Sequence, residues 1–228
     1  KPRMALEPET GYVGLSIIVS GNGFAASKSV TITYDGVQKG TATTDKEGSF
    51  SGVSFTIPKG KYGNHPVKAT DASRNSYTAS FVMESTPPPS PGLVSPANAS
   101  RVGFVSKATP TFEWSVVTDD SGISHYSLEI ASDAEFTNLL LSASEITAEP
   151  NAEIVTYTPE EALPYGTYYW RVKAIDNAQN NGAWTTPPYS FHAALLPLWA
   201  FIVIIALIVV LIITVVYFLA IRKRLAYG

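Results

Sequence analysis

The chain has 228 residues, of which 45% are hydrophobic, and a formal net charge of −3. This length allows one or two ordinary domains. The part before Leu195 holds all 19 acidic residues and 13 of the 16 basic ones, and this acidic balance argues against nucleic acid as a partner. Because the chain has no cysteine, disulfides, thiolate metal sites and cysteine nucleophiles are excluded.

The chain opens on Lys1, without an initiator methionine or a secretion signal. We therefore expect a processed or truncated product with further sequence upstream. In residues 1–84, apolar residues alternate with polar ones in four short runs, at 15–19, 30–34, 53–57 and 77–83. Turn formers such as Asp35-Gly36 separate these runs. Period-two alternation with such spacing predicts an antiparallel β-sandwich.

Residues 85–92 read Ser-Thr-Pro-Pro-Pro-Ser-Pro-Gly. A segment of this composition neither pairs as a strand nor forms a helix, and it is typical of a short, stiff spacer. We therefore predict a linker here, between a first domain at 1–84 and a second at 93–194.

Residues 93–194 alternate in the same way, with larger aromatic side chains at 112–116, 126–130 and 168–174. We predict a second β-sandwich whose core is centred on Trp114, Tyr126 and Trp170. A short helical turn is expected near residues 133–139, capped by Ser132 or Asp133.

One pattern occurs in both halves, because Asp71 and Asn75 have the same spacing as Asp176 and Asn180, each pair just after an alternating run. Asp and Asn side chains bond to local backbone in tight turns. We expect the last two strands of each domain to be joined by this turn.

Residues 195–221 form a run of 27 residues without a charge, in which Thr214 is the only clearly polar side chain. At about 1.5 Å per residue, such a helix exceeds the roughly 30 Å of a bilayer core. Trp199 and Tyr217 lie near its two ends, where aromatic rings suit the headgroup layers. We predict one transmembrane helix at 195–221.

Arg222, Lys223 and Arg224 follow this run directly, whereas the nearest upstream Lys or Arg is Lys173. The positive-inside tendency predicts a short basic cytoplasmic tail at 222–228 and places both domains outside the cell. The predicted location is a cell membrane, crossed once.

Acidic side chains suggest one candidate metal site. Asp119, Asp120, Asp176 and Asn177 could converge at one pole of the second domain and bind calcium through oxygen ligands. The favoured alternative is that these acids bond local turn amides, so we predict no metal site.

Other candidate sites are weaker, and no cofactor, small-molecule substrate or enzymatic activity is predicted. The histidines at 65, 125 and 192 lack metal-ligand spacing, and the adjacent Glu160 and Glu161 cannot face each other across a glycosidase cleft. Tyrosines 165, 169 and 189 could stack on sugars or a protein, although cross-strand packing is the simpler interpretation. Asn98-Ala99-Ser100 is a glycosylation sequon.

The first domain, with Thr10-Gly11-Tyr12-Val13-Gly14 and Ala69-Thr70-Asp71-Ala72-Ser73-Arg74-Asn75, resembles the immunoglobulin-like repeats of bacterial and archaeal surface proteins. The second, with Phe112-Glu113-Trp114 and Leu163-Pro164-Tyr165-Gly166-Thr167-Tyr168-Tyr169-Trp170-Arg171-Val172, is similar to their fibronectin type III-like modules. In these sequences a glycine usually precedes the closing Asn, where this chain has Arg74 and Gln179. The resemblance implies a fold class: all-β, with two tandem immunoglobulin-like or fibronectin type III-like β-sandwiches, plus the C-terminal transmembrane helix. In the fibronectin pattern a corner tyrosine is expected, which either Tyr168 or Tyr169 could supply.

These predictions favour a membrane-anchored structural or interaction protein, a β-sandwich stalk that holds an upstream domain or partner at the surface. Its expected partners are the lipid bilayer and a protein at the cell surface or in the membrane. Two alternatives stay open, a single-span accessory subunit of a larger membrane complex and the C-terminal anchor of a secreted enzyme. The absence of cysteine favours a bacterial or archaeal source.

Overall fold

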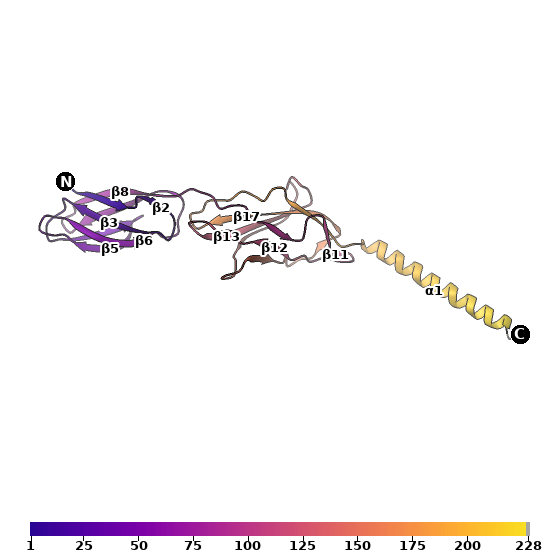
Figure 1. Ribbon diagram of the computed structural model, residues 1–228. Coiled ribbons are helices and arrows are strands. Elements are labelled where there is room, and N and C mark those ends of the chain that lie inside the picture. Colours follow the sequence, from indigo (N-terminus) through magenta and orange to yellow (C-terminus); the bar gives the residue numbers. More distant parts are fainter. Residues whose placement is uncertain (227–228) are drawn as a thin grey trace.

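The computed structural model describes residues 1–226, with side chains described through Arg222. Two β-sandwich domains lie end to end, and a single helix, α1 (Leu198–Ala226), leaves the far end of the second domain (Figure 1). The N-terminus lies at the opposite end of the molecule from the helix. The predicted fold class of two tandem sandwiches followed by one long apolar helix is confirmed.

The first domain has eight strands in two sheets. They are β1 (Arg3–Glu7), β2 (Thr10–Gly11), β3 (Ser16–Asn22), β4 (Ser29–Tyr34), β5 (Val37–Thr43), β6 (Phe50–Thr56), β7 (Gly63–Asp71) and β8 (Ser76–Met83). One sheet has the order β1-β3-β6 and the other β2-β8-β7-β4-β5. The alternating residues of β3, β4 and β6 point between the sheets, where Ile17, Ile32 and Phe55 are buried.

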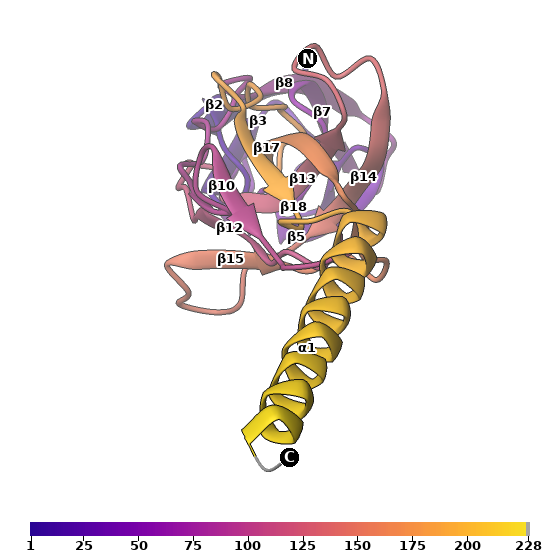
Figure 2. The ribbon, with the colours of Figure 1, turned by 90° about the vertical axis from the view of Figure 1, so that its right-hand side faces the viewer.

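The second domain has ten strands. They are β9 (Leu93–Ser95), β10 (Ser100–Val102), β11 (Lys107–Ala108), β12 (Phe112–Ser115), β13 (Ile123–Ala131), β14 (Leu139–Ile146), β15 (Ile154–Tyr157), β16 (Leu163–Pro164), β17 (Gly166–Asp176) and β18 (Tyr189–Ala193). The sheet orders are β10-β18-β17-β13-β14, β15-β12-β9 and the small pair β11-β16. Figure 2 views the molecule from the helix end, with the second domain in front of the first.

Aromatic rings fill the core of the second domain, as predicted. Trp114, Tyr126 and Trp170 are at most 1% exposed, and the Trp114 and Tyr126 rings meet edge to face at 5.8 Å. The Tyr168 hydroxyl donates to the Pro164 carbonyl at 3.0 Å. Tyr168 is therefore the corner tyrosine, and it fastens the start of β17 to the preceding loop.

The same turn follows β7 and β17. In the first domain it joins β7 to β8, which pair antiparallel, as expected. In the second domain the turn is followed by a longer connection before β18, which also pairs antiparallel with β17. Arg74 and Gln179, which stand where related sequences have glycine, have φ of 69° and 63°. The left-handed residue of each turn is thus the one before Asn, while Asn itself bonds to Asp.

Two local expectations differ from the structure. Both domains contain one parallel pair, β2 with β8 and β10 with β18, because an early strand of each domain joins the edge of the sheet that holds the last strand. Residues 133–139 form a turn and no helix. The Asp133 carboxylate accepts the backbone amides of Thr137 and Asn138 at 2.9 and 2.8 Å, so it closes the loop in place of a helix cap.

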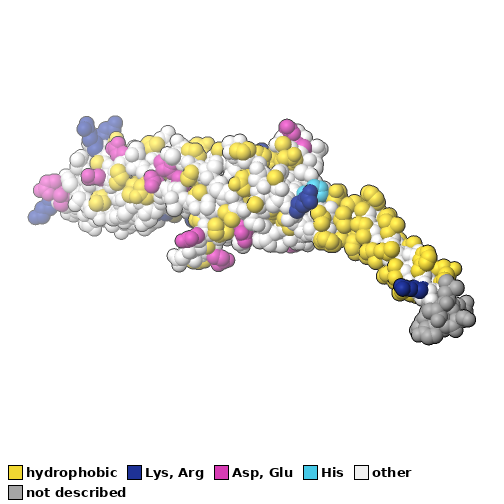
Figure 3. All heavy atoms as spheres, turned by 45° about the vertical axis from the view of Figure 1, so that its right-hand side comes forward, with side chains coloured by type: hydrophobic (Ala, Val, Ile, Leu, Met, Phe, Trp, Pro, Cys, Tyr) yellow, Lys and Arg dark blue, Asp and Glu magenta, His cyan; other side chains and the backbone are white. Residues whose placement is uncertain are grey.

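Helix α1 begins directly after Pro197, whose carbonyl accepts the Phe201 amide at 3.2 Å. Proline suits a helix start because it lacks the amide that a first turn leaves unbonded. Among the described residues, α1 is the one helix long and apolar enough to cross a membrane, over Leu198–Arg222. None of the most apolar window within Leu198–Arg222 is buried by the domains, and Figure 3 shows the surface of the helix as mostly hydrophobic on the visible side.

Candidate acidic site at the domain junction

The two domains are joined by packing as well as by the chain. The turn after β17 docks on the first domain, where the Gly60 amide donates to the Asn177 carbonyl at 3.3 Å and the Tyr62 amide donates to the Ala178 carbonyl at 2.8 Å. Ala178 is 0% exposed and packs in the hydrophobic core of the first domain. The second domain therefore inserts a side chain into the core of the first.

The proline-rich segment supports this junction. No strand or helix lies between Met83 and Leu93. Pro88 and Pro91 are buried, and a Cβ added to Gly182 would lie 2.7 Å from the Pro88 carbonyl oxygen. The segment thus packs along the second domain, where it adds to the rigidity of the connection.

Three carboxylates meet at this junction. Glu84 follows β8 of the first domain, Asp119 lies in the loop after β12, and Asp176 ends β17. One oxygen from each lies within 4.8 Å of the others. The first domain therefore supplies one carboxylate and the second domain two.

Local hydrogen bonds orient these carboxylates. The Ser121 hydroxyl donates to Glu84, and the Ser121 amide donates to Asp119 at 2.8 Å, so one serine links both domains. The Asn180 amide and side chain donate to the two oxygens of Asp176 at 2.7 and 2.8 Å. Each carboxylate therefore has a defined position before any ligand arrives.

The site concentrates negative charge in a buried place. Asp176 is 0% exposed, and no Lys or Arg of the described chain forms an ion pair with the three acids. Burial, together with the charge of Glu84, raises the pKa of Asp176 above its usual value despite the hydrogen bonds from Asn180. Burial and the charges of Asp176, Glu84 and Asp120 likewise raise the pKa of Asp119.

Such a group has two chemical options. Oxygen ligands from three carboxylates and a hydroxyl match what calcium prefers, so Glu84, Asp119 and Asp176 are the residues that could hold a cation. The same residues can instead share protons, because carboxylates this close cannot all ionise without cost.

The structure brings together two of the three predicted acids. Asp120 is exposed and lies outside the group, whereas Asn177 bonds the Ser121 carbonyl through its side-chain amide at 2.8 Å. Glu84 was not predicted from the sequence because this residue belongs to the other domain and precedes the linker. Its distance along the sequence from Asp119 and Asp176 does not indicate that the packed domains bring the three residues together. Its position directly after the last strand of the first domain is the signal that could have indicated it.

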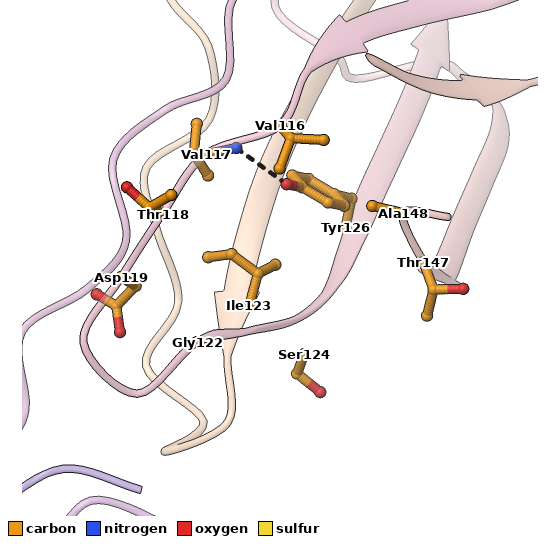
Figure 4. Close-up of a pocket in the computed structure, with 10 residues that line it drawn as sticks. All are labelled: Val116, Val117, Thr118, Asp119, Gly122, Ile123, Ser124, Tyr126, Thr147 and Ala148. Atoms are coloured by element: carbon orange, nitrogen blue, oxygen red, sulfur yellow. Dashed lines mark hydrogen bonds between the residues drawn. The ribbon is translucent and has the colours of Figure 1, made fainter. Parts of the chain in front are cut away.

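A cavity of about 440 Å³ opens beside Asp119 (Figure 4). Val116, Ile123 and Ala148 contribute to its wall, and the Tyr126 hydroxyl inside it accepts the Val117 amide at 3.2 Å. In the close-up, Asp119 lies on the loop and its carboxylate points away from Tyr126, which lies on β13. The cavity therefore lacks the converging polar groups that would orient a small ligand.

The remaining candidate residues lie apart from one another. His65 contacts Asp35 at 2.7 Å, His125 contacts Glu145 at 3.3 Å, and His192 contacts the Ala194 carbonyl at 2.9 Å. Glu160 and Glu161 line a separate pocket of about 430 Å³ with Leu140 and Tyr157. The exposed Asn98 of the sequon accepts the Ser190 amide at 3.0 Å, and of the three tyrosines Tyr165 is exposed while Tyr169 and Tyr189 are half-buried.

The predicted membrane-interface residues occupy the two ends of α1. Trp199 is 70% exposed in the first turn and Tyr217 is 62% exposed about five turns later. Arg222 is exposed and follows the apolar stretch. The side chains of Lys223 and Arg224, and most of the tail predicted at 222–228, lie outside the residues whose side chains the structure describes.

Comparisons with known families agree with this architecture. Residues 4–83 match the IPT/TIG domain family, and residues 98–197 match the family of the Rha78A-like N-terminal immunoglobulin domain. Both domains are therefore immunoglobulin-like sandwiches. The second domain, expected to be fibronectin type III-like, matches an immunoglobulin family, while fibronectin modules occur among the similar solved structures. No curated protein matches the chain.

Several solved structures are similar to the chain at low sequence identity. The fibronectin(III)-like modules of Clostridium thermocellum CbhA are 14% identical, with 86% of this chain and 95% of that chain covered and a TM-score of 0.35. The FN1–FN3 domains of chicken CNTN1 are 11% identical, with 81% and 65% covered and a TM-score of 0.34. The BSP domain of a biofilm-associated protein is 16% identical, with 85% and 29% covered and a TM-score of 0.27.

Proposed function

We propose that this protein is a membrane-anchored spacer, without enzymatic activity, that holds a partner or further domains at a set distance from the cell surface. The observation that carries this proposal is the packed junction. Ala178 of the second domain lies in the core of the first, and two backbone hydrogen bonds cross the contact. A spacer can set a distance only if its domains do not swing about their linker.

Helix α1 supports the anchoring part of the proposal. Its candidate span of 25 residues, Leu198–Arg222, is about 37 Å long, which exceeds the hydrocarbon thickness of about 30 Å. The basic residues at 222–224 favour a cytoplasmic C-terminus by the positive-inside tendency. Both domains then stand outside, and the junction lies roughly one domain length, about 35–40 Å, from the bilayer.

Electron spin resonance on labelled cysteines tests the rigidity. Because the chain has no cysteine, Val37→Cys and Leu140→Cys introduce two unique labels, one exposed on each domain. In lipid nanodiscs we expect a single narrow distance distribution between them. A broad distance distribution, as expected for a flexible linker, would contradict the proposal of a rigid spacer.

Labelling of intact cells tests the orientation. A membrane-impermeant maleimide should label Val37→Cys from outside and should reach Gly228→Cys only after permeabilisation. The reverse pattern would contradict the proposed topology. Purification in mild detergent with fixed amounts of other membrane polypeptides would instead support the accessory-subunit alternative.

A further inference from the structure

The chain between the second domain and α1 is held against the domain. The amides of Leu195 and Leu196 donate to the Phe104 carbonyl at 2.9 and 3.0 Å, and the Ser106 amide donates to the Leu196 carbonyl at 3.0 Å. Val105 and Leu196 form a parallel bridge. Only Pro197 separates this contact from the first residue of α1, so the helix leaves the domain without a flexible tether.

The loop that makes this contact has a defined shape. Gly103 has φ of 82°, and a Cβ added there would lie 2.7 Å from the Cβ of Ala108. The Tyr165 amide donates to the Ser106 carbonyl at 2.8 Å, which fixes the other side of the loop. Phe104 is therefore presented by a backbone that is bonded on both sides.

The side chains at this end of the domain are apolar and unusually exposed. Phe104 is 62% exposed, Tyr165 43% and Leu195 39%, and Trp199 in the first turn of α1 is 70% exposed. We call these four residues the helix-side rim. Large exposed aromatic side chains that are grouped in this way mark an interaction surface.

The position of the rim relative to α1 identifies its partner. The apolar stretch exceeds the bilayer core by about 7 Å, so its end turns lie in the headgroup layers. The Phe104 carbonyl is bonded two to three residues before the helix start, within about 10 Å of it along the chain. Each headgroup layer is about 5–7 Å thick, so the Phe104 backbone lies at most roughly 6–8 Å beyond its outer edge, which is about the reach of a phenylalanine side chain.

Charge at the same end agrees with a lipid surface. Lys107 is exposed, follows the rim loop directly, and forms none of the ion pairs found among the described side chains. Figure 3 shows a Lys or Arg side chain next to a histidine where the yellow helix begins. Phosphate groups are the natural partners of such a lysine, while rings of Phe, Tyr and Trp suit the boundary between headgroups and acyl chains.

We propose that the helix-side rim is a second membrane contact, in which Phe104 and Tyr165 enter the phospholipid headgroup layer beside α1 and seat the second domain on the bilayer. This inference rests on the proposed membrane anchor. It adds that the second domain contacts the lipid surface. The angle between the spacer and the membrane is then fixed by this contact as well as by the domain junction.

Single cysteines carrying an environment-sensitive fluorophore test the proposal in full-length protein, reconstituted in vesicles of phosphatidylcholine and phosphatidylglycerol with spin-labelled quencher lipids. Phe104→Cys reports the rim, Ile208→Cys reports the middle of α1, and Val37→Cys, 61% exposed on the first domain, is the matched control. We expect shallow quenchers to act on the label at 104, deep quenchers to act on the label at 208, and neither to act at 37.

Each outcome has a separate meaning. A label at 104 that behaves like the one at 37, while 208 is quenched, overturns the rim contact and leaves the anchor intact. A label at 208 that is not quenched overturns the anchor itself.

A second labelling site allows the native Phe104 side chain to be tested, because the label no longer replaces it. With the label moved to the exposed Thr109→Cys, quenching by shallow lipids should be present with Phe104 and lost with Phe104→Ser. Unchanged quenching in the serine variant would show that Phe104 does not seat the domain.

Discussion

The turns at Asp71 and Asp176 share the same hydrogen bonds between Asp and Asn, but the pKa values of their aspartates shift in opposite directions. In both, Asp accepts the amide and the side chain of the Asn four residues later, at 2.7–2.9 Å. Although burial acts to raise it, hydrogen bonds from Ala25, Asn75 and Ser73 lower the pKa of Asp71. Burial and the nearby Glu84 raise the pKa of Asp176.

The difference comes from what each turn faces. Residues 72–75 are exposed at the free end of the first domain, and Asp71 accepts amides from its own loop and from Ala25 of the same domain. The second turn is pressed against the first domain, where Ala178 is buried and Glu84 approaches Asp176. One local motif therefore closes a hairpin in one domain and builds a junction in the other.

The largest effect is expected from the residue that distinguishes the two turns. Ala178→Glu places an unpaired charge in the core of the first domain and should weaken the junction by about 3 kcal/mol or more. The narrow distance distribution between labels at 37 and 140 should become broad. Ser73→Glu, at the equivalent exposed position, should leave it narrow, and equal effects would mean that the turns do not differ as described.

A smaller difference is expected between the folding stabilities of the variants Asp71→Asn and Asp176→Asn. Asp71→Asn turns an acceptor of the Ala25 amide, now bonded at 2.8 Å, into a donor, and should destabilise the first domain by about 1–3 kcal/mol. Asp176→Asn removes a charge beside two carboxylates, and Asn180 can rotate its amide to keep the pair bonded. Chemical denaturation in the presence of EDTA should show this variant to be unchanged or more stable, and a loss as large as for Asp71→Asn would contradict the comparison.

The contributions of Asp71 and Asp176 to folding stability should depend on pH in opposite directions. Folded Asp176 and Asp119 hold their protons more tightly than the unfolded chain, whose reference pKa is 3.8, so their contribution to stability falls as pH rises above about 4. Asp71 has a lowered pKa, so its contribution is present above about 4 and is lost on further acidification. Melting curves of the wild type and of Asp176→Asn between pH 3 and 7, in EDTA, should diverge with rising pH. Parallel curves would refute this assignment.

The smallest effect concerns the backbone that the turns share. Arg74 and Gln179 adopt positive φ, which costs a side-chain-bearing residue about 1 kcal/mol that glycine avoids, partly offset by the entropy of glycine in the unfolded chain. Arg74→Gly and Gln179→Gly should each stabilise by up to about 1 kcal/mol in thermal melts. Destabilisation of only Gln179→Gly would indicate that its side chain also supports the junction.

Much of the fold could be predicted because strand periodicity is local. Alternation in β3, β4 and β6 identified the buried residues, and the aromatic centre of the second domain followed from the size of Trp114 and Trp170. The expected helical turn at 133–139 was wrong because an Asp that can cap a helix can equally close a loop. The candidate site was predicted in part, since Asp119 and Asp176 belong to one domain, whereas Glu84 reaches them across the junction.

By itself, the sequence determined the number of sandwiches, the turn motif in each and the long apolar helix, because strand alternation, turn chemistry and hydrophobic length are properties of neighbouring residues. Only the tertiary structure decided that Ala178 enters the other domain's core and that Glu84 meets Asp119 and Asp176. It also placed Phe104 beside the start of α1. These contacts join residues far apart in the chain, and their energies depend on burial and on charges that local sequence does not contain.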